Sequence, residues 1–174
     1  GINVASVEWL KEVYQICKDN DIIMIVDDIQ VGNGRTGTFF SFERAGIKPD
    51  MVVLSKSISG FGMPMAILLI RPAEHNGTFR GNQLSFVGAT AGINYYVEHS
   101  MDKVVQRKAK MISDFLESEI IPLNKNLSYR GIGFIWGIDF NAIDSTLALK
   151  VVHKAFDNGL IMEVAGRKDG VLKI

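Results

Sequence analysis

The sequence is poorest in cysteine, with Cys17 as its single example. One cysteine excludes an internal disulfide and fits a reducing, cytoplasmic environment. No apolar run reaches the roughly 18 residues that a membrane helix needs, and no signal-peptide pattern opens the chain. Net charge is missing too, because 19 basic residues balance 19 acidic ones, so nothing indicates binding to nucleic acid or to an anionic membrane. The histidines His75, His99 and His153 lack metal-ligand spacing, so we expect no metal site.

The composition is that of a globular protein. Of 174 residues, 47% are hydrophobic and 22% charged, a balance that favours a packed core over disorder. The chain starts at Gly1 without a methionine and stops at VLKI, in what reads as a strand. We therefore expect a piece of a longer protein, which alone would neither fold stably nor catalyse.

Two kinds of secondary structure follow one another along the chain. IIMIVDD (22–28) and MVVLS (51–55) are apolar without alternation, which is typical of parallel strands buried on both faces. A third apolar run covers 65–70. Helices are expected at 7–18, 81–97, 100–121 and 144–159, and further strands at 134–140, 160–164 and 171–174. The sequence thus predicts an α/β layer followed by a smaller α+β unit.

The stretch VDDIQVGNGRTG (26–37) offers one candidate nucleotide site, because Gly32, Gly34 and Gly37 match the spacing G-x-G-x-x-G. In a dinucleotide site, however, the glycines follow the strand directly and open an apolar helix. Here DDIQV separates strand from glycines, and TFFSFERAG follows them. We therefore interpret the glycines as a loop beyond the site and expect the two preceding aspartates to do the chemistry.

Asp27 and Lys56 form the stronger candidate site. Both stand at or just after the carboxyl end of a predicted buried strand, where open α/β sheets bind ligands. Taken alone, Lys56 could be a solvated charge. Together the two side chains suggest pyridoxal phosphate, because a carboxylate keeps the pyridine nitrogen protonated and a lysine amine forms the Schiff base.

Three segments resemble class III (ω-amino acid) aminotransferases: 25–60, 74–90 and RGIGFIWGIDF at 130–140. The resemblance covers nearly the whole chain in one continuous order. It implies an α/β protein of fold-type I, with part of a mainly parallel sheet. Residues 1–105 would be the C-terminal part of the cofactor-binding large domain. Residues 106–174 would be a linking helix and the start of a small α+β domain, and the family's N-terminal half would be absent.

The resemblance also assigns roles position by position. Asp27 matches the aspartate that pairs with the pyridine nitrogen, Ile29 the residue that packs on the ring, and Gln30 the glutamine beside the phenolic oxygen. Lys56 matches the lysine that forms the Schiff base and moves the proton. Thr78 matches a threonine that reaches the cofactor phosphate of a second subunit, which implies a homodimer. Alone, Ile29 could be core, Gln30 a turn residue and Thr78 a helix N-cap.

Within the family, HNGTFRGNQLSFVGAT (75–90) looks most like enzymes that exchange an amino group between glutamate and L-aspartate 4-semialdehyde, which gives L-2,4-diaminobutyrate and 2-oxoglutarate. Other class III substrates (ornithine, acetylornithine or 4-aminobutyrate) and a non-catalytic paralogue remain open. Three features depart from the family, the first being Asp28, which stands where many relatives have glutamate. The connection between Ile70 and Glu74 is short, and Lys173 lies where many relatives place an arginine for the substrate carboxylate.

Overall fold

The computed structural model describes residues 1–60, 62–71 and 80–174, and it divides into two compact units. The large unit comprises Ala5–Val104; the small unit comprises Gly1–Val4 together with Val105–Ile174. The sequence predicted a boundary after residue 105, and it gave no sign that the first four residues pack with the C-terminal part. The assignment of these units to the family's large and small domains stays a prediction.

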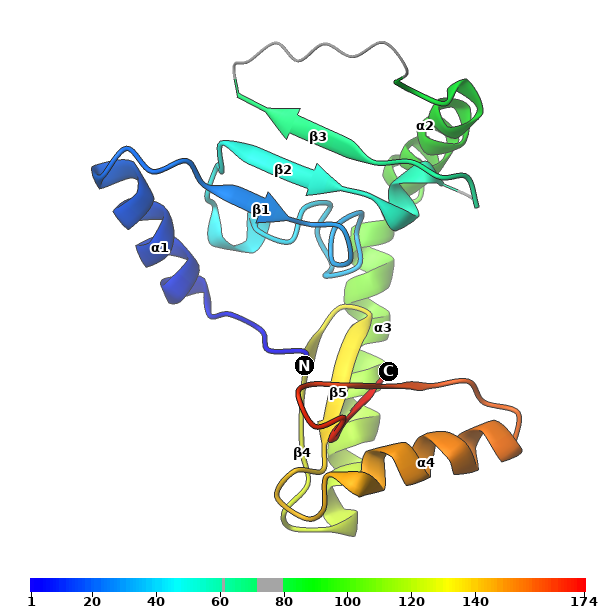
Figure 1. Ribbon diagram of the computed structural model, residues 1–174. Helices are drawn as coiled ribbons and strands as arrows, with labels where there is room; N and C mark the ends of the chain where they lie inside the picture. Colours follow the sequence, from blue (N-terminus) through cyan, green and yellow to red (C-terminus); the bar gives the residue numbers. More distant parts are fainter. Residues whose placement is uncertain (61, 72–79) are drawn as a thin grey trace. The chain divides into compact units, whose positions relative to one another are not determined.

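The large unit holds a sheet of three strands in the order β1-β2-β3 (Figure 1). β1 and β2 are parallel, whereas β2 and β3 are antiparallel, so the described part of this sheet is mixed rather than mainly parallel. The strands are shorter than the apolar runs that predicted them. The elements of the large unit are α1 (Val7–Asp19), β1 (Ile25–Asp27), β2 (Met51–Leu54), β3 (Ile67–Ile70) and α2 (Gln83–Glu98), with 3₁₀ helices at Glu43–Ala45 and Lys56–Ser59.

Polar contacts fix both ends of α1. At its start the Ser6 hydroxyl accepts a hydrogen bond of 3.1 Å from the Trp9 amide, the N-cap that the sequence predicted. At its end Lys18 pairs with Asp50 at 2.7 Å, and Asp50 also accepts the Met24 amide at 2.9 Å. The hydrogen bond between Lys18 and Asp50 raises the pKa of the lysine and lowers the pKa of the carboxyl. Asp50 therefore ties the end of α1 and the start of β1 to the start of β2.

The core of the large unit lies on β2 rather than β1. Val52, Leu54 and Ile58 are buried and pack against phenylalanines of the 39–42 loop. In contrast, Ile25 in β1 is 58% exposed, so the expected burial of this strand on both faces is not found. Among the described strands β1 has a neighbour on one side only, so it lies at the edge of this sheet rather than at its centre.

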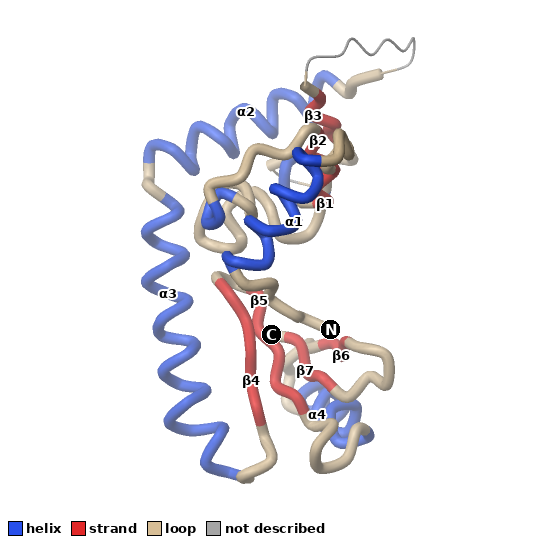
Figure 2. The backbone as a smooth tube through the Cα atoms, turned by 90° about the vertical axis from the view of Figure 1, so that its left-hand side faces the viewer, coloured by secondary structure: helices blue, strands red, loops and turns tan. Residues whose placement is uncertain are grey.

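The small unit is built on a four-stranded antiparallel sheet in the order β4-β5-β7-β6. β4 was not predicted as a strand of its own. α4 packs against β6 and β7 (Figure 2), and Leu116, Trp136, Ile138, Ala148 and Leu172 form the buried core. The elements are α3 (Met101–Phe115), inside which the unit boundary falls, a π-helical turn (Leu116–Ile120), a 3₁₀ turn (Ile121–Leu123), β4 (Ser128–Ile132), β5 (Ile135–Asp139), α4 (Thr146–Asp157), β6 (Glu163–Ala165) and β7 (Val171–Lys173).

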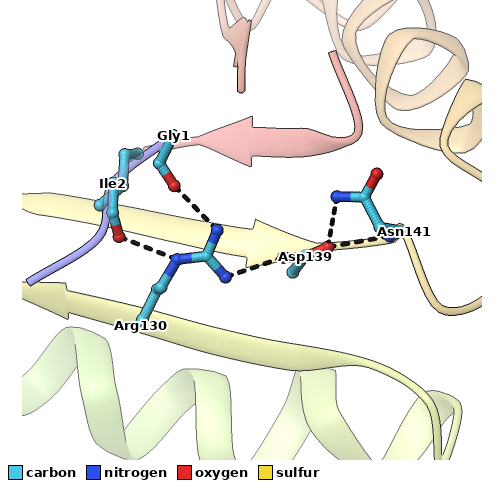
Figure 3. Close-up of polar contacts among 5 residues, drawn as sticks. All are labelled: Gly1, Ile2, Arg130, Asp139 and Asn141. Carbon is cyan, nitrogen blue, oxygen red and sulfur yellow. Dashed lines mark hydrogen bonds and ion pairs between the residues drawn. The ribbon is translucent and has the colours of Figure 1, made fainter. Parts of the chain in front are cut away.

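Arg130 holds the first residues of the chain on this sheet (Figure 3). Its Nε donates to the Ile2 carbonyl at 2.9 Å, Nη2 to the Gly1 carbonyl at 2.8 Å, and Nη1 to Asp139 Oδ2 at 2.8 Å. Burial acts to raise the pKa of Asp139, but hydrogen bonds from Arg130 and Asn141 outweigh it and the pKa is lowered. The guanidinium thus satisfies two backbone carbonyls and one carboxylate at once.

Candidate cofactor site

The loops after β1 and β2 bring the predicted site residues to one edge of the sheet. Because the two strands are parallel and Asp27 is in register with Val53, their carboxyl ends meet at the same edge. Asp27 ends β1, and Lys56 opens the 3₁₀ helix that follows β2. Both side chains are exposed, as a ligand-binding carboxylate and amine must be.

The two adjacent aspartates have different environments. Asp27 is exposed, and its Oδ1 accepts the Ile29 amide at 3.0 Å, which orients the carboxylate. Asp28 is fully buried; its Oδ2 accepts the Ser41 amide at 2.9 Å and its Oδ1 accepts the Ser41 hydroxyl. Its backbone amide also donates to the Val53 carbonyl at 2.9 Å. The expectation that both aspartates do chemistry is therefore corrected: Asp28 holds the 39–42 loop, and Asp27 alone faces outward.

The glycines form a turn, as predicted. The Gly32 amide donates to the Asp28 carbonyl at 3.0 Å, and the Gly37 amide to the Gly34 carbonyl at 3.0 Å. Gly34 has φ 85°, and a Cβ there would lie 2.3 Å from Cε2 of Tyr96. Only glycine combines this backbone conformation with so close an aromatic ring. No helix follows the glycines directly, so the geometry of a dinucleotide-binding turn is absent from residues 29–42.

Lys56 has a backbone conformation that is uncommon for its residue type. Its φ is 53°, in the left-handed region, which costs an L-residue other than glycine about 1–2 kcal/mol. Neighbouring contacts hold it there: Ser59 Oγ donates to the Lys56 carbonyl at 3.3 Å, and Ser55 Oγ to the Met65 carbonyl at 2.8 Å. Gly60 lies directly against Gly88 of α2. Backbone strain of this kind is retained at functional sites, and the sequence gave no signal of it.

The remaining predicted residues are placed only in part. Ile29 is half-buried and Gln30 is exposed, both in the loop after β1. The structure therefore brings Asp27, Ile29, Gln30 and Lys56 to neighbouring loops, and their roles stay predictions. Thr78, His75 and most of the short Ile70–Glu74 connection lie outside the described residues. Within the described ranges, no three or more His, Cys, Asp or Glu side chains are grouped so that they could hold a metal ion.

Known sequences match this chain along its whole length. The family model described as aminotransferase class-III matches residues 1–173. The diaminobutyrate–2-oxoglutarate transaminase of Bordetella parapertussis is 46% identical over 184 residues, which cover 100% of this chain and 42% of the relative. The transaminase of the same name from Halalkalibacterium halodurans is 50% identical over 183 residues, again with 100% and 42% covered. The chain thus spans less than half the length of these relatives.

Solved structures of aminotransferases also match the fold of this chain. An ornithine aminotransferase from Toxoplasma gondii has a TM-score of 0.85 at 25% identity, with 100% of this chain and 43% of that one covered. An N-acetylornithine aminotransferase from Stenotrophomonas maltophilia has a TM-score of 0.84 at 27% identity, with 98% and 45% covered. These neighbours confirm the predicted fold class, and the class III family match supports pyridoxal phosphate as the cofactor. The chain belongs to the class III aminotransferases.

Proposed function

We propose that the full-length protein is a pyridoxal-phosphate-dependent aminotransferase that moves an amino group between glutamate and L-aspartate 4-semialdehyde, with L-2,4-diaminobutyrate and 2-oxoglutarate as products. The family match supports the reaction class. Relatives that are 44% to 50% identical support the substrate pair, since their names specify diaminobutyrate and 2-oxoglutarate. The single free cysteine, Cys17, fits our proposal of a cytoplasmic enzyme. None of the described helices is long and apolar enough to cross a membrane.

The described residues fit the cofactor at two of its reactive points. A bound pyridoxal phosphate needs a carboxylate for its ring nitrogen and a primary amine for its aldehyde. Asp27 and Lys56 offer these groups from the ends of adjacent parallel strands. Within the described part of the chain the Lys56 amine makes no hydrogen bond or ion pair, so it is available for this bond. This pairing of an outward carboxylate with an outward amine is the observation that carries the proposal.

Each site residue then has one proposed task. When bound, the cofactor supplies an electron sink for charge that develops on the substrate carbon. Lys56 binds the cofactor aldehyde through Nζ, and the same atom moves the proton to and from the carbon that carries the amino group. Asp27 holds the proton on the ring nitrogen, Ile29 packs on the ring, and Gln30 hydrogen-bonds to the phenolic oxygen. Thr78 contacts the cofactor phosphate of a second subunit, which makes the enzyme a homodimer.

Lys173, which lies where many family members place an arginine, is not a free cation in this structure. Its Nζ forms an ion pair with Glu163 of the neighbouring strand β6. The pair neutralises the lysine charge at the position where many family members place an arginine. We therefore propose that Lys173 does not act as a free cationic anchor for the substrate carboxylate in this enzyme.

The test uses the full-length protein and its visible spectrum. L-2,4-Diaminobutyrate is added without a keto acid, and the same mixing is repeated with Lys56→Ala and with Lys48→Ala, an exposed lysine of the same unit, as a matched control. We expect the visible band of the bound cofactor to be lost on mixing and restored by 2-oxoglutarate, in wild type and Lys48→Ala only. A band that responds to ornithine but not to diaminobutyrate would refute the substrate. Absence of any band would refute the function.

A further inference from the structure

We propose that Asn33 is a positioning residue for Lys56 and acts through Ser57. The inference rests on the proposed role of Lys56. It extends that role to a side chain of the glycine loop that otherwise serves only to turn the chain. Asn33 would fix the loop on which the reactive amine stands, without contact to substrate or cofactor.

The geometry joins two loops that are distant in the sequence. Asn33 Nδ2 donates to Ser57 Oγ at 3.2 Å, across 24 residues. Ser57 directly follows Lys56, whereas Asn33 belongs to the loop that follows Asp27. The hydrogen bond therefore connects the loop that carries the carboxylate with the loop that carries the amine.

Asn33 and Lys56 share an unusual backbone conformation. Asn33 has φ 56° and Lys56 has φ 53°. Asparagine adopts the left-handed region more readily than most residues, so position 33 suits it on two counts, the backbone and the donated hydrogen bond. Lysine has no such preference. Its conformation has to be imposed by neighbours, and the neighbour of Lys56 that reaches the other loop is Ser57.

Burial shields the oxygen of the Asn33 amide. Its Oδ1 is shielded from solvent and has no hydrogen-bond partner among the described residues. Thr36 Oγ1 and the Tyr96 hydroxyl are in the same condition, and Tyr96 packs over the neighbouring Gly34. The oxygen side of the amide is thus closed to water, whereas the Nδ2 side lies at the surface and donates to Ser57. This arrangement gives the amide a fixed direction, which is what a positioning contact needs.

Four variants of the full-length protein test the inference. Asn33→Gly keeps the left-handed backbone and removes the amide, Ser57→Ala removes the acceptor, and the double variant removes both. Ser57→Thr keeps the hydroxyl and serves as the rescue. The readout is the rate at which the apoprotein binds added pyridoxal phosphate covalently on Lys56. Borohydride reduction stops the reaction at each time point, and the mass of the Lys56 peptide shows how much cofactor is attached. Thermal unfolding of each apoprotein is recorded in parallel.

We expect each single loss to slow capture by roughly two- to tenfold, the effect of one hydrogen bond between side chains. The double variant should be no slower than either single one, because both changes remove the same contact. Ser57→Thr should capture at close to the wild-type rate. Multiplying effects, or unchanged capture with lowered thermal stability only, would overturn the positioning role. Labelling of a lysine other than Lys56 in the wild-type protein would instead overturn the proposed function, whatever the Asn33 variants show.

Discussion

Replacement of Gly34 by alanine is expected to destabilise the large unit by about 2–5 kcal/mol. Two costs add. The residue has φ 85°, where an L-residue other than glycine loses about 1–2 kcal/mol. The new methyl group would also lie 2.3 Å from Tyr96 Cε2, well inside the 3.4 Å at which ordinary contact begins. Relief needs a shift of the tyrosine ring, for which overpacked sites typically lose about 1–3 kcal/mol.

A second glycine of the same unit separates the two costs. Gly46 has φ 65°, but a Cβ there would meet nothing within 4 Å. Gly46→Ala should therefore lose only the conformational part, about 1–2 kcal/mol. The difference between the two variants measures the overlap with the ring.

Urea unfolding of the full-length protein, with hydrogen exchange of the 29–42 amides to localise the effect, is the assay. Because Phe39 makes an edge contact with the Tyr96 ring at 5.5 Å between centroids, the ring cannot move without disturbing a second aromatic residue. In a Tyr96→Ala background the added cost of Gly34→Ala should fall to that of Gly46→Ala. Equal losses for Gly34→Ala and Gly46→Ala in the wild-type background would refute the reasoning.

Two further predictions concern carboxylates. Asp28→Asn should lower the free energy of unfolding by about 1–3 kcal/mol, because the buried amide cannot accept both hydrogen bonds of Ser41. Asp27→Asn, at an exposed position, should change the free energy of unfolding by less than about 0.5 kcal/mol yet weaken cofactor binding. Urea unfolding measures the first effect and a cofactor titration the second. The pKa of Asp139 is lowered in the folded state, so its contribution is present above the ordinary value of 3.8 and is lost as the pH falls below it. Unfolding of the small unit between pH 5 and about pH 2 should show a smaller acid loss in Arg130→Ala than in the wild type; an equal loss would contradict this prediction.

The sequence predicted the two strands that position Asp27 and Lys56, because the signals for these strands are local in the sequence. An apolar run that ends in Asp27, a second one that ends just before Lys56, and the Ser6 N-cap are all readable within a few residues. Parallel pairing then follows from the expected α/β class, and it brings the two strand ends together. Interactions between distant residues were not readable. Asp28 and Ser41 look like any polar pair in the sequence, and nothing in GNGRTG indicates that Tyr96 packs on Gly34.

The missed secondary structure has a similar cause. The residues of β4 include Arg130 and Gly131, which break the apolar alternation expected of a half-buried strand. Arg130 is there because it binds two backbone carbonyls and Asp139, a requirement set by residues near the start of the chain. β3 was expected as an apolar run, but an apolar run alone does not indicate whether the strand pairs parallel or antiparallel with β2.

The contact between Arg130 and Ile2 spans 128 residues, with the whole large unit inserted between them. During synthesis residues 1–4 leave the ribosome long before Arg130 does, so this contact forms only after the whole large unit has been made. Closing so long a loop costs only slightly more entropy than closing half of it, but it slows the step. A chimera that takes residues 105–174 from a relative would combine the relative's small-unit sheet with residues 1–4 of this chain. Recombination between relatives therefore has to cut this chain twice to move one intact unit.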